Sequence, residues 1–242
     1  MKQAPTPTID AGGVQAIGSA AATAKIGPNA VTQLINALDA AGLQPAAAAI
    51  FAEAGIADWL SDPPTAMVDE RPVALLHQTL RKMLSPQQSV EILADAGRRT
   101  ADYILAFRIP KPAQFVLKLL PAPLAARMLV AAIRAHAWTF AGSGRFSGLI
   151  GKSVTFEIAA NPLCAGEHSD SLVCVWHAAV FQRLFQVLVS PNTRVVETSC
   201  GARGDDCCRF VADWRSIPDA ANIYASRRAR SAAGSSETLS AH

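Results

Sequence analysis

Charged and aromatic side chains are both scarce in this sequence. Charged residues make up 17% of the 242 positions and aromatic residues 6%, whereas soluble domains usually have about 25% charged residues. Half of the residues are hydrophobic by count, and alanine supplies much of that half. This composition excludes a disordered or fibrous protein and favours closely packed helices. The length allows one large domain or two small ones.

The sequence also lacks a strong charge of one sign and a long apolar run. Its 22 Lys+Arg against 19 Asp+Glu give a net charge of +3, which is too small a surplus to indicate nucleic-acid binding. The first eight residues, Met-Lys-Gln-Ala-Pro-Thr-Pro-Thr, contain no apolar core of a secretory signal. The most apolar long stretch, 115–138, is interrupted by cations and prolines, and a span takes about 20 apolar residues. We therefore expect a cytoplasmic protein without a membrane span.

The first half of the sequence has the periodicity of helices. The residues Val31, Leu34, Ile35 and Leu38 share one helical face, and Gly42 follows as a stop. Helices are predicted at about 29–42, 45–54, near 60, 72–84, 86–107 and 112–140, the last broken around residues 121–123. No internal repeat is evident.

The second half changes character after residue 140. The glycine-rich segment 142–151 is interpreted as a flexible connection, and the alternation in Ser153–Ile158 predicts a strand. A helix is expected at 172–189, followed by two strands at 193–198 and 208–214 that form a hairpin. Helices packed on a small antiparallel sheet make an α+β fold.

This pattern divides the chain into four parts. We expect a loose arm at 1–27, a helical region at 28–145, an α+β core at 146–217 and a disordered tail at 218–242. Three arginines of the tail, Arg227, Arg228 and Arg230, form a weak basic patch for an anionic membrane surface.

The glycine-rich segment does not match a nucleotide-binding loop. Gly151-Lys152-Ser153 ends like a phosphate-binding loop, but Phe146 stands where that loop requires a glycine. A strand should also precede a dinucleotide-binding loop, and here it follows the glycines. The sequence thus shows no recognisable NAD(P)H site.

The cysteines form the sharper signal. Five cysteines in a chain of this length are not a disulfide scaffold. Cys174, Glu197, Cys200 and Cys208 make a four-ligand set that would suit Zn²⁺, with the hairpin ligands spaced E-x2-C-x7-C. Alternation along a strand turns Cys207 away from Cys208. His177 is a rival ligand in place of Glu197, and the alternative to any metal is a group of reduced, partly buried thiols.

The same region resembles a known family. Residues 196–200, Val-Glu-Thr-Ser-Cys, and 204–210, Gly-Asp-Asp-Cys-Cys-Arg-Phe, resemble the signature of the 4-vinyl-reductase (4VR) domain family. Residues 136–144 are similar to the family member that belongs to bacteriochlorophyll biosynthesis. The resemblance implies a fold like that of transport-particle subunits of the Golgi and of the sensory domains of phenol-responsive transcription activators. Those sensory domains bind zinc through a Cys, a Glu and two further Cys, which match Cys174, Glu197, Cys200 and Cys208. A zinc bound there would be structural.

The family name implies reduction of a vinyl group on a divinyl chlorophyllide precursor. Such a reduction needs a hydride or electron source, and no nicotinamide, flavin or iron–sulfur motif is visible. We therefore favour an accessory protein or carrier that binds a magnesium tetrapyrrole, such as divinyl protochlorophyllide. The alternatives are a vinyl reductase that uses an external reductant and a scaffolding subunit for other pathway enzymes. A homodimer and a position peripheral to the photosynthetic membrane are compatible with each alternative.

A tetrapyrrole needs an apolar slot, cationic groups for its propionates and an axial ligand for its magnesium. We expect His136 as the axial ligand, Trp138 and Phe140 as slot walls, and Arg145 or Lys152 at the propionates. The slot is expected between the 112–140 helices and the sheet that begins near Val154. The alternative is that these residues are ordinary core and surface groups.

Overall fold

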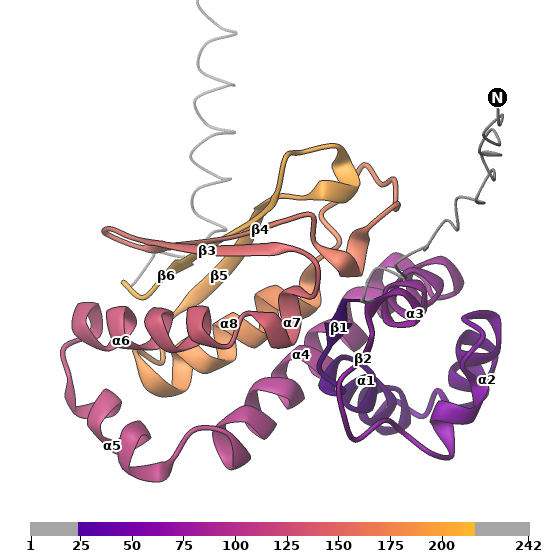
Figure 1. Ribbon diagram of the computed structural model, residues 1–242, viewed down its shortest axis with the longest axis horizontal. Coiled ribbons are helices and arrows are strands. Elements are labelled where there is room, and N and C mark those ends of the chain that lie inside the picture. Colours follow the sequence, from indigo (N-terminus) through magenta and orange to yellow (C-terminus); the bar gives the residue numbers. More distant parts are fainter. Residues whose placement is uncertain (1–23, 216–242) are drawn as a thin grey trace, which may run out of the picture.

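The computed structural model describes residues 24–215, and these residues form an α+β fold. A four-stranded antiparallel sheet lies over α6, α7 and α8, while α1, α2 and α3 gather at the other end of the long helix α4 (Figure 1). The α-helices are α1 (Asn29–Ala40), α2 (Gln44–Glu53), α3 (Glu70–Met83), α4 (Pro86–Phe107), α5 (Lys111–Leu119), α6 (Ala122–Ala135), α7 (Trp138–Ala141) and α8 (Val175–Leu188). The strands are β1 (Lys25–Ile26), β2 (Val68–Asp69), β3 (Arg145–Ile150), β4 (Val154–Ala159), β5 (Arg194–Ser199) and β6 (Cys208–Asp213). Three short 3₁₀ helices are η1 (Ala57–Leu60), η2 (Pro162–Cys164) and η3 (Gly201–Arg203).

The order of strands in the sheet is β3-β4-β6-β5. Alternate residues of β4 and β6 are buried, so one face of the sheet is apolar. Phe156 of β4 lies opposite Phe210 of β6, and both pack against α8 through Phe181, whose ring centroid is 4.5 Å from that of Phe156. The sheet and α8 thus share one aromatic core.

Helix α4 connects the two ends of the molecule, because it packs on α8 and on α1. Ser85 begins it with a capping box in which Gln88 is the reciprocal partner. Gly97 allows the close approach to α8, since a Cβ atom there would lie 2.5 Å from the backbone oxygen of Trp176. The predicted range 86–107 for this helix is confirmed.

The predicted flexible connection at 142–151 is wrong, because most of it is strand β3. Its glycines are sites of close approach rather than signs of a loop. A Cβ at Gly148 would lie 2.8 Å from Cγ1 of Val130 on α6, and a Cβ at Gly144 would lie 2.8 Å from the backbone oxygen of Ala160. The edge strand β3 therefore needs these glycines in order to pack.

The predicted helix over 112–140 is three helices, with breaks at Pro121 and after His136. Within the range predicted as an N-terminal arm, residues 24–27 include β1, which pairs with β2 and buries Ile26 completely. The rest of that arm and the tail 218–242 lie outside the described residues. Among residues 24–215, no helix has the length and hydrophobicity that crossing a bilayer requires.

His77 on α3 makes folding sensitive to pH. Its side chain is buried, and Nε2 lies 2.9 Å from the backbone oxygen of Ala30. Burial lowers the pKa of His77 from 6.5 to about 3, and the charge of Arg81 contributes, although the bond to Ala30 opposes the shift. The imidazole is therefore neutral in the folded state and becomes protonated on unfolding below pH 6.5, so stability falls as the pH decreases toward 3.

We predict that His77→Gln, which keeps a donor for Ala30, weakens this pH dependence. Between pH 7 and pH 5 the wild type should lose about 1–2 kcal/mol more of its free energy of unfolding than the variant loses. Urea denaturation at both pH values measures the difference. The exposed His168→Gln is the control and should behave like the wild type. Equal losses in wild type and His77→Gln would contradict this account.

Candidate functional site

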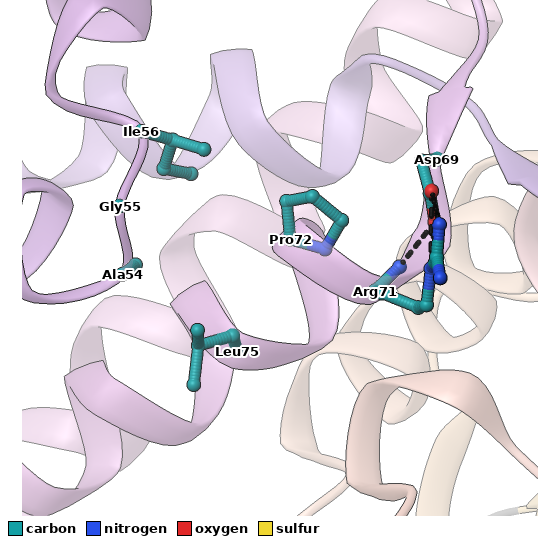
Figure 2. Close-up of a pocket in the computed structure, with 7 residues that line it drawn as sticks. All are labelled: Ala54, Gly55, Ile56, Asp69, Arg71, Pro72 and Leu75. Atoms are coloured by element: carbon teal, nitrogen blue, oxygen red, sulfur yellow. Dashed lines mark hydrogen bonds and ion pairs between the residues drawn. The ribbon is translucent and has the colours of Figure 1, made fainter.

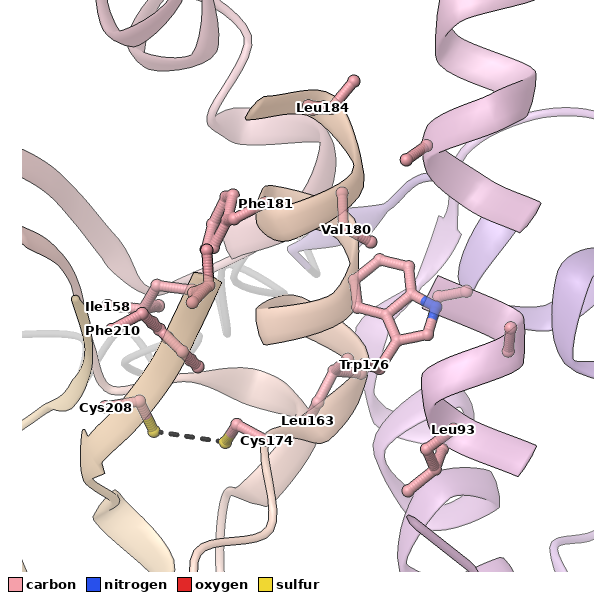
Figure 3. Close-up of a cluster of buried hydrophobic side chains, with 14 of the residues drawn as sticks. Leu93, Ile158, Leu163, Cys174, Trp176, Val180, Phe181, Leu184, Cys208 and Phe210 are labelled. Atoms are coloured by element: carbon pink, nitrogen blue, oxygen red, sulfur yellow. Dashed lines mark hydrogen bonds between the residues drawn. The ribbon is translucent and has the colours of Figure 1, made fainter. Parts of the chain in front are cut away.

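Four buried cysteines meet beneath the hairpin tip. Cys164 ends η2, Cys174 precedes α8, Cys200 follows β5 and Cys208 begins β6. Their sulfur atoms all lie within 4.8 Å of one another. The Sγ–Sγ distances are 3.4 Å for Cys174 and Cys208, 3.6 Å for Cys164 and Cys208, and 3.7 Å for Cys174 and Cys200. Figure 3 shows Cys174 and Cys208 facing each other at the edge of the aromatic core.

These distances fit a tetrahedral metal centre. Zinc–thiolate bonds of about 2.3 Å place the sulfurs of a tetrahedron about 3.8 Å apart. The longest distance with a direct sulfur contact, Cys200 to Cys208, is 4.0 Å. All four cysteines are free thiols rather than disulfides. The donor set is therefore the one that zinc prefers in closed structural sites.

Local structure holds the four sulfurs in place. The Asn161 side chain caps η2 by accepting from the backbone N–H of Leu163. The guanidinium of Arg81 on α3 donates to the Leu163 carbonyl and forms a largely buried ion pair with Glu167. In the hairpin, the left-handed conformation of Gly204 (φ +86°) lets the chain turn back toward Cys208.

Nearby N–H groups point at the sulfurs. The Asn161 side-chain nitrogen lies 3.3 Å from Sγ of Cys174, and the Gly201 backbone N–H lies 3.4 Å from Sγ of Cys208. Hydrogen bonds from the thiols of Cys164 and Cys174 lower the pKa of Cys200 below its ordinary value. The same contacts, together with burial, raise the pKa of Cys174. The cluster thus stabilises negative charge on part of its sulfurs.

Glu197 lies beside the four sulfurs but is not one of the four converging ligands. Its Oε2 accepts a hydrogen bond of 2.9 Å from the backbone N–H of Cys174. Its other oxygen, Oε1, is buried and has no hydrogen-bond partner among the described residues. Burial and the neighbouring Cys200 raise the pKa of Glu197 to about 9. Of the predicted ligands, the structure therefore brings together Cys174, Cys200 and Cys208, with Cys164 as the fourth sulfur.

The two rival ligands lie elsewhere. Cys207 is partly exposed and its sulfur lies 3.8 Å from the guanidinium of Arg209, on the side of the strand away from Cys208. His177 is buried among aromatic rings, where its ring centroid lies 4.9 Å from that of Trp176. Burial lowers the pKa of His177 to about 4.

Sequence reasoning missed Cys164. It is separated by ten positions from Cys174 and falls in a stretch that was predicted as a loop, so no ligand spacing singled it out. One signal was available, because Asn-Pro at 161–162 is typical of a capped turn that begins a short helix.

The residues predicted for a tetrapyrrole are divided between the surface and the core. His136, Trp138 and Arg145 are exposed, with 60% of Trp138 accessible. Phe140 instead packs edge-on against Phe146, with ring centroids 5.2 Å apart.

The expected interior slot is filled by side chains. Phe140, Phe146, Phe156 and Phe181 form a continuous set of ring contacts between α7, the sheet and α8. A macrocycle that contacts His136 would therefore have to lie on the surface. The prediction of a slot between helices and sheet is wrong, because aromatic packing occupies that space.

Two cavities lie near other elements. One of about 380 Å³ lies between α2 and α3, where Arg71 donates to Asp69, the residue that begins α3 (Figure 2). This pair serves the helix end. Another cavity of about 510 Å³ adjoins the cysteines and is lined by Cys164, Cys207 and His168 among others.

The chain is similar to two curated proteins, both described as "Bacteriochlorophyll synthase 23 kDa chain". The protein from Cereibacter sphaeroides is 48% identical over 193 residues, which cover 80% of this chain and 92% of that protein. The protein from Rhodobacter capsulatus is 41% identical over 188 residues, which cover 77% of this chain and 86% of that protein.

Among solved structures, a chain described under "Probing the function of heme distortion in the H-NOX family" is similar at a TM-score of 0.49 and 12% identity, covering 80% of this chain and 97% of that chain. An H-NOX protein from S. oneidensis is similar at a TM-score of 0.41 and 10% identity, covering 76% of this chain and 98% of that chain. The family model of the 4VR domain matches residues 144–213, which confirms the resemblance of the cysteine-containing region. The chain therefore belongs to the family of bacteriochlorophyll synthase 23 kDa chains and carries a 4VR domain.

Proposed function

We propose that this protein acts in bacteriochlorophyll biosynthesis as an accessory subunit that binds a magnesium tetrapyrrole. The names of its relatives support a role in this pathway and an association with a pathway enzyme, a bacteriochlorophyll synthase. The alternative of a reductase lacks such support, because vinyl reduction needs an electron source and the sequence contains no recognisable dinucleotide loop.

The state of His136 carries the proposal of pigment binding. The residue follows the last turn of α6, is exposed, and its Nδ1 lies 2.9 Å from the backbone oxygen of Ala132. A carbonyl accepts, so Nδ1 carries the proton and the lone pair is on Nε2. A carbonyl on one ring nitrogen is the arrangement that fixes histidine ligands of metals. His136 is thus prepared to donate Nε2 to the magnesium of a tetrapyrrole.

Two neighbours complete a surface for a planar, partly charged molecule. Trp138 lies two residues after His136 and exposes most of its indole, an uncommon position for so large an apolar group. Arg145 begins β3 and is exposed, so its guanidinium is available to a propionate. The aromatic core behind Phe140 keeps α7 fixed to the sheet.

We predict that His136→Ala weakens binding of divinyl protochlorophyllide at least about tenfold or removes the spectral shift that binding causes. An absorption titration of the purified protein measures both, with His168→Ala as a matched exposed control that should bind like the wild type. Unchanged affinity and spectrum in His136→Ala would remove this residue from the site. A monovinyl product formed in the presence of NADPH would favour the reductase, and no binding at all would favour a scaffold.

We also propose that Cys164, Cys174, Cys200 and Cys208 hold one structural zinc ion. The observation that supports it is the near-tetrahedral spacing of four buried sulfurs from four segments. No coordination position is left open for a substrate in a four-thiolate site. The ion would tie η2 and the start of α8 to the hairpin and contribute to folding. Glu197 would then act as an acceptor for Cys174 rather than as a ligand.

We predict about one zinc per chain in protein purified without chelators. Cys164→Ser should lose the metal or unfold at a clearly lower temperature, because one ligand is removed. Cys207→Ser is the matched control and should keep both metal and melting temperature, and Glu197→Gln should keep the metal. Elemental analysis and thermal denaturation give the two readouts. Full metal content in Cys164→Ser together with metal loss in Glu197→Gln would return the fourth position to Glu197.

A further inference from the structure

The positive charge of the protein is concentrated in one segment. Between Asp102 and Glu157 the sequence contains seven Lys and Arg residues and no Asp or Glu. Because the whole chain has a net charge of only +3, the remainder carries more acidic than basic residues. The segment includes the end of α4 and all of α5, α6 and β3.

The helices of this segment are apolar on the side that faces outward. On α5, Gln114 and Leu117 are buried, and Phe115 and Leu119 point away from them with 64% and 69% of their surface exposed. On α6, the buried side is Ala125, Ala126, Leu129, Val130 and Ile133. Its opposite side carries Leu124 and Met128, both about half exposed.

We name this surface the α5–α6 patch. Its apolar members are Phe107, Phe115, Leu119, Leu124 and Met128. Its cations are Arg108, Lys111, Lys118 and Arg127, all exposed. Helix α5 lies at the lower rim of the molecule in Figure 1, on the side of α6 away from the sheet. Within residues 24–215, none of these four cations forms an ion pair.

The α5 backbone is fixed in this outward orientation. Pro112 stands in its first turn and Pro121 precedes α6, so both helices begin at prolines. The buried amide of Gln114 donates to the backbone oxygen of Ile109 at 2.8 Å and so ties the helix to the loop before it. The exposed apolar side chains are therefore presented by an ordered element.

We propose that the α5–α6 patch binds the surface of an anionic lipid bilayer. Exposed Phe and Leu side chains insert at the boundary between headgroups and acyl chains, while Lys and Arg beside them contact anionic headgroups. The long side chains of Lys118 and Arg127 keep their charge at the headgroups as their stems lie along the apolar surface. The helices lie on the bilayer and do not cross it.

Charge favours a lipid over other occupants. A second copy of the chain using the same patch would place cations against cations, which opposes an isologous contact. The cores of protein–protein interfaces are depleted of Lys, and α5 carries both Lys111 and Lys118. The absence of any carboxylate over the whole segment is of no use to a mixed-charge protein partner, but it is what an anionic surface requires.

The test is flotation of the pigment-free full chain with vesicles. Vesicles of phosphatidylcholine with about one third phosphatidylglycerol should carry the protein, and pure phosphatidylcholine should carry much less, because the attraction is partly electrostatic. Raising the salt concentration should release it. Phe115→Ser/Leu119→Ser should lower partitioning by about tenfold or more, and Lys118→Glu/Arg127→Glu should abolish the preference for the anionic lipid.

Two matched controls keep the result specific. Val196→Ser removes an exposed apolar side chain from β5, and Lys82→Glu reverses an exposed charge on α3, and neither change should alter flotation. Failure of the wild type to float, or equal losses in the controls, would overturn the proposal. So would a dimer, seen by sedimentation, that Phe115→Ser/Leu119→Ser dissociates without any vesicle binding. The assay contains no tetrapyrrole, so its outcome is independent of the pigment proposal.

Discussion

The convergence of four buried thiols is the constraint on which the 4VR domain of this protein depends. The sulfurs come from η2, the start of α8, the end of β5 and the start of β6, and four measured pairs lie 3.4–4.0 Å apart. The polar groups around them serve that geometry: Asn161 and Arg81 hold η2, and Glu197 holds the N–H of Cys174. A closed cation at this point would stabilise the junction of helix and hairpin without taking part in chemistry.

Local signals were enough for the elements with strong periodicity. The range of α4 followed from its proline start and apolar face, and the hairpin of β5 and β6 from alternation. Strand β3 was missed because Gly144 and Gly148 are signs of a turn in sequence, whereas in the fold they allow contact with Ala160 and Val130. That contact is tertiary, so no local pattern contains it. The same holds for Cys164, whose partners are at least ten residues away.

The surface and the core divide the proposed work. The aromatic residues between α7, the sheet and α8 fill the interior, so recognition is left to exposed groups such as His136 and Trp138. These residues follow directly on α6, whose outward side belongs to the α5–α6 patch. A protein that rests on a bilayer through this patch would hold its pigment surface near the membrane, where lipophilic tetrapyrroles partition. The closed cysteine centre would then support the sheet where β6 begins.

X-ray absorption at the zinc K-edge of the purified full chain tests the central claim most directly. A four-thiolate centre predicts four sulfur neighbours at about 2.3 Å and no nitrogen or oxygen neighbour bound to the zinc. Three sulfurs with one oxygen at about 2.0–2.2 Å would mean that Glu197, and not Cys164, completes the site. Protein that is folded and free of zinc, with reduced thiols, would contradict a metal centre altogether.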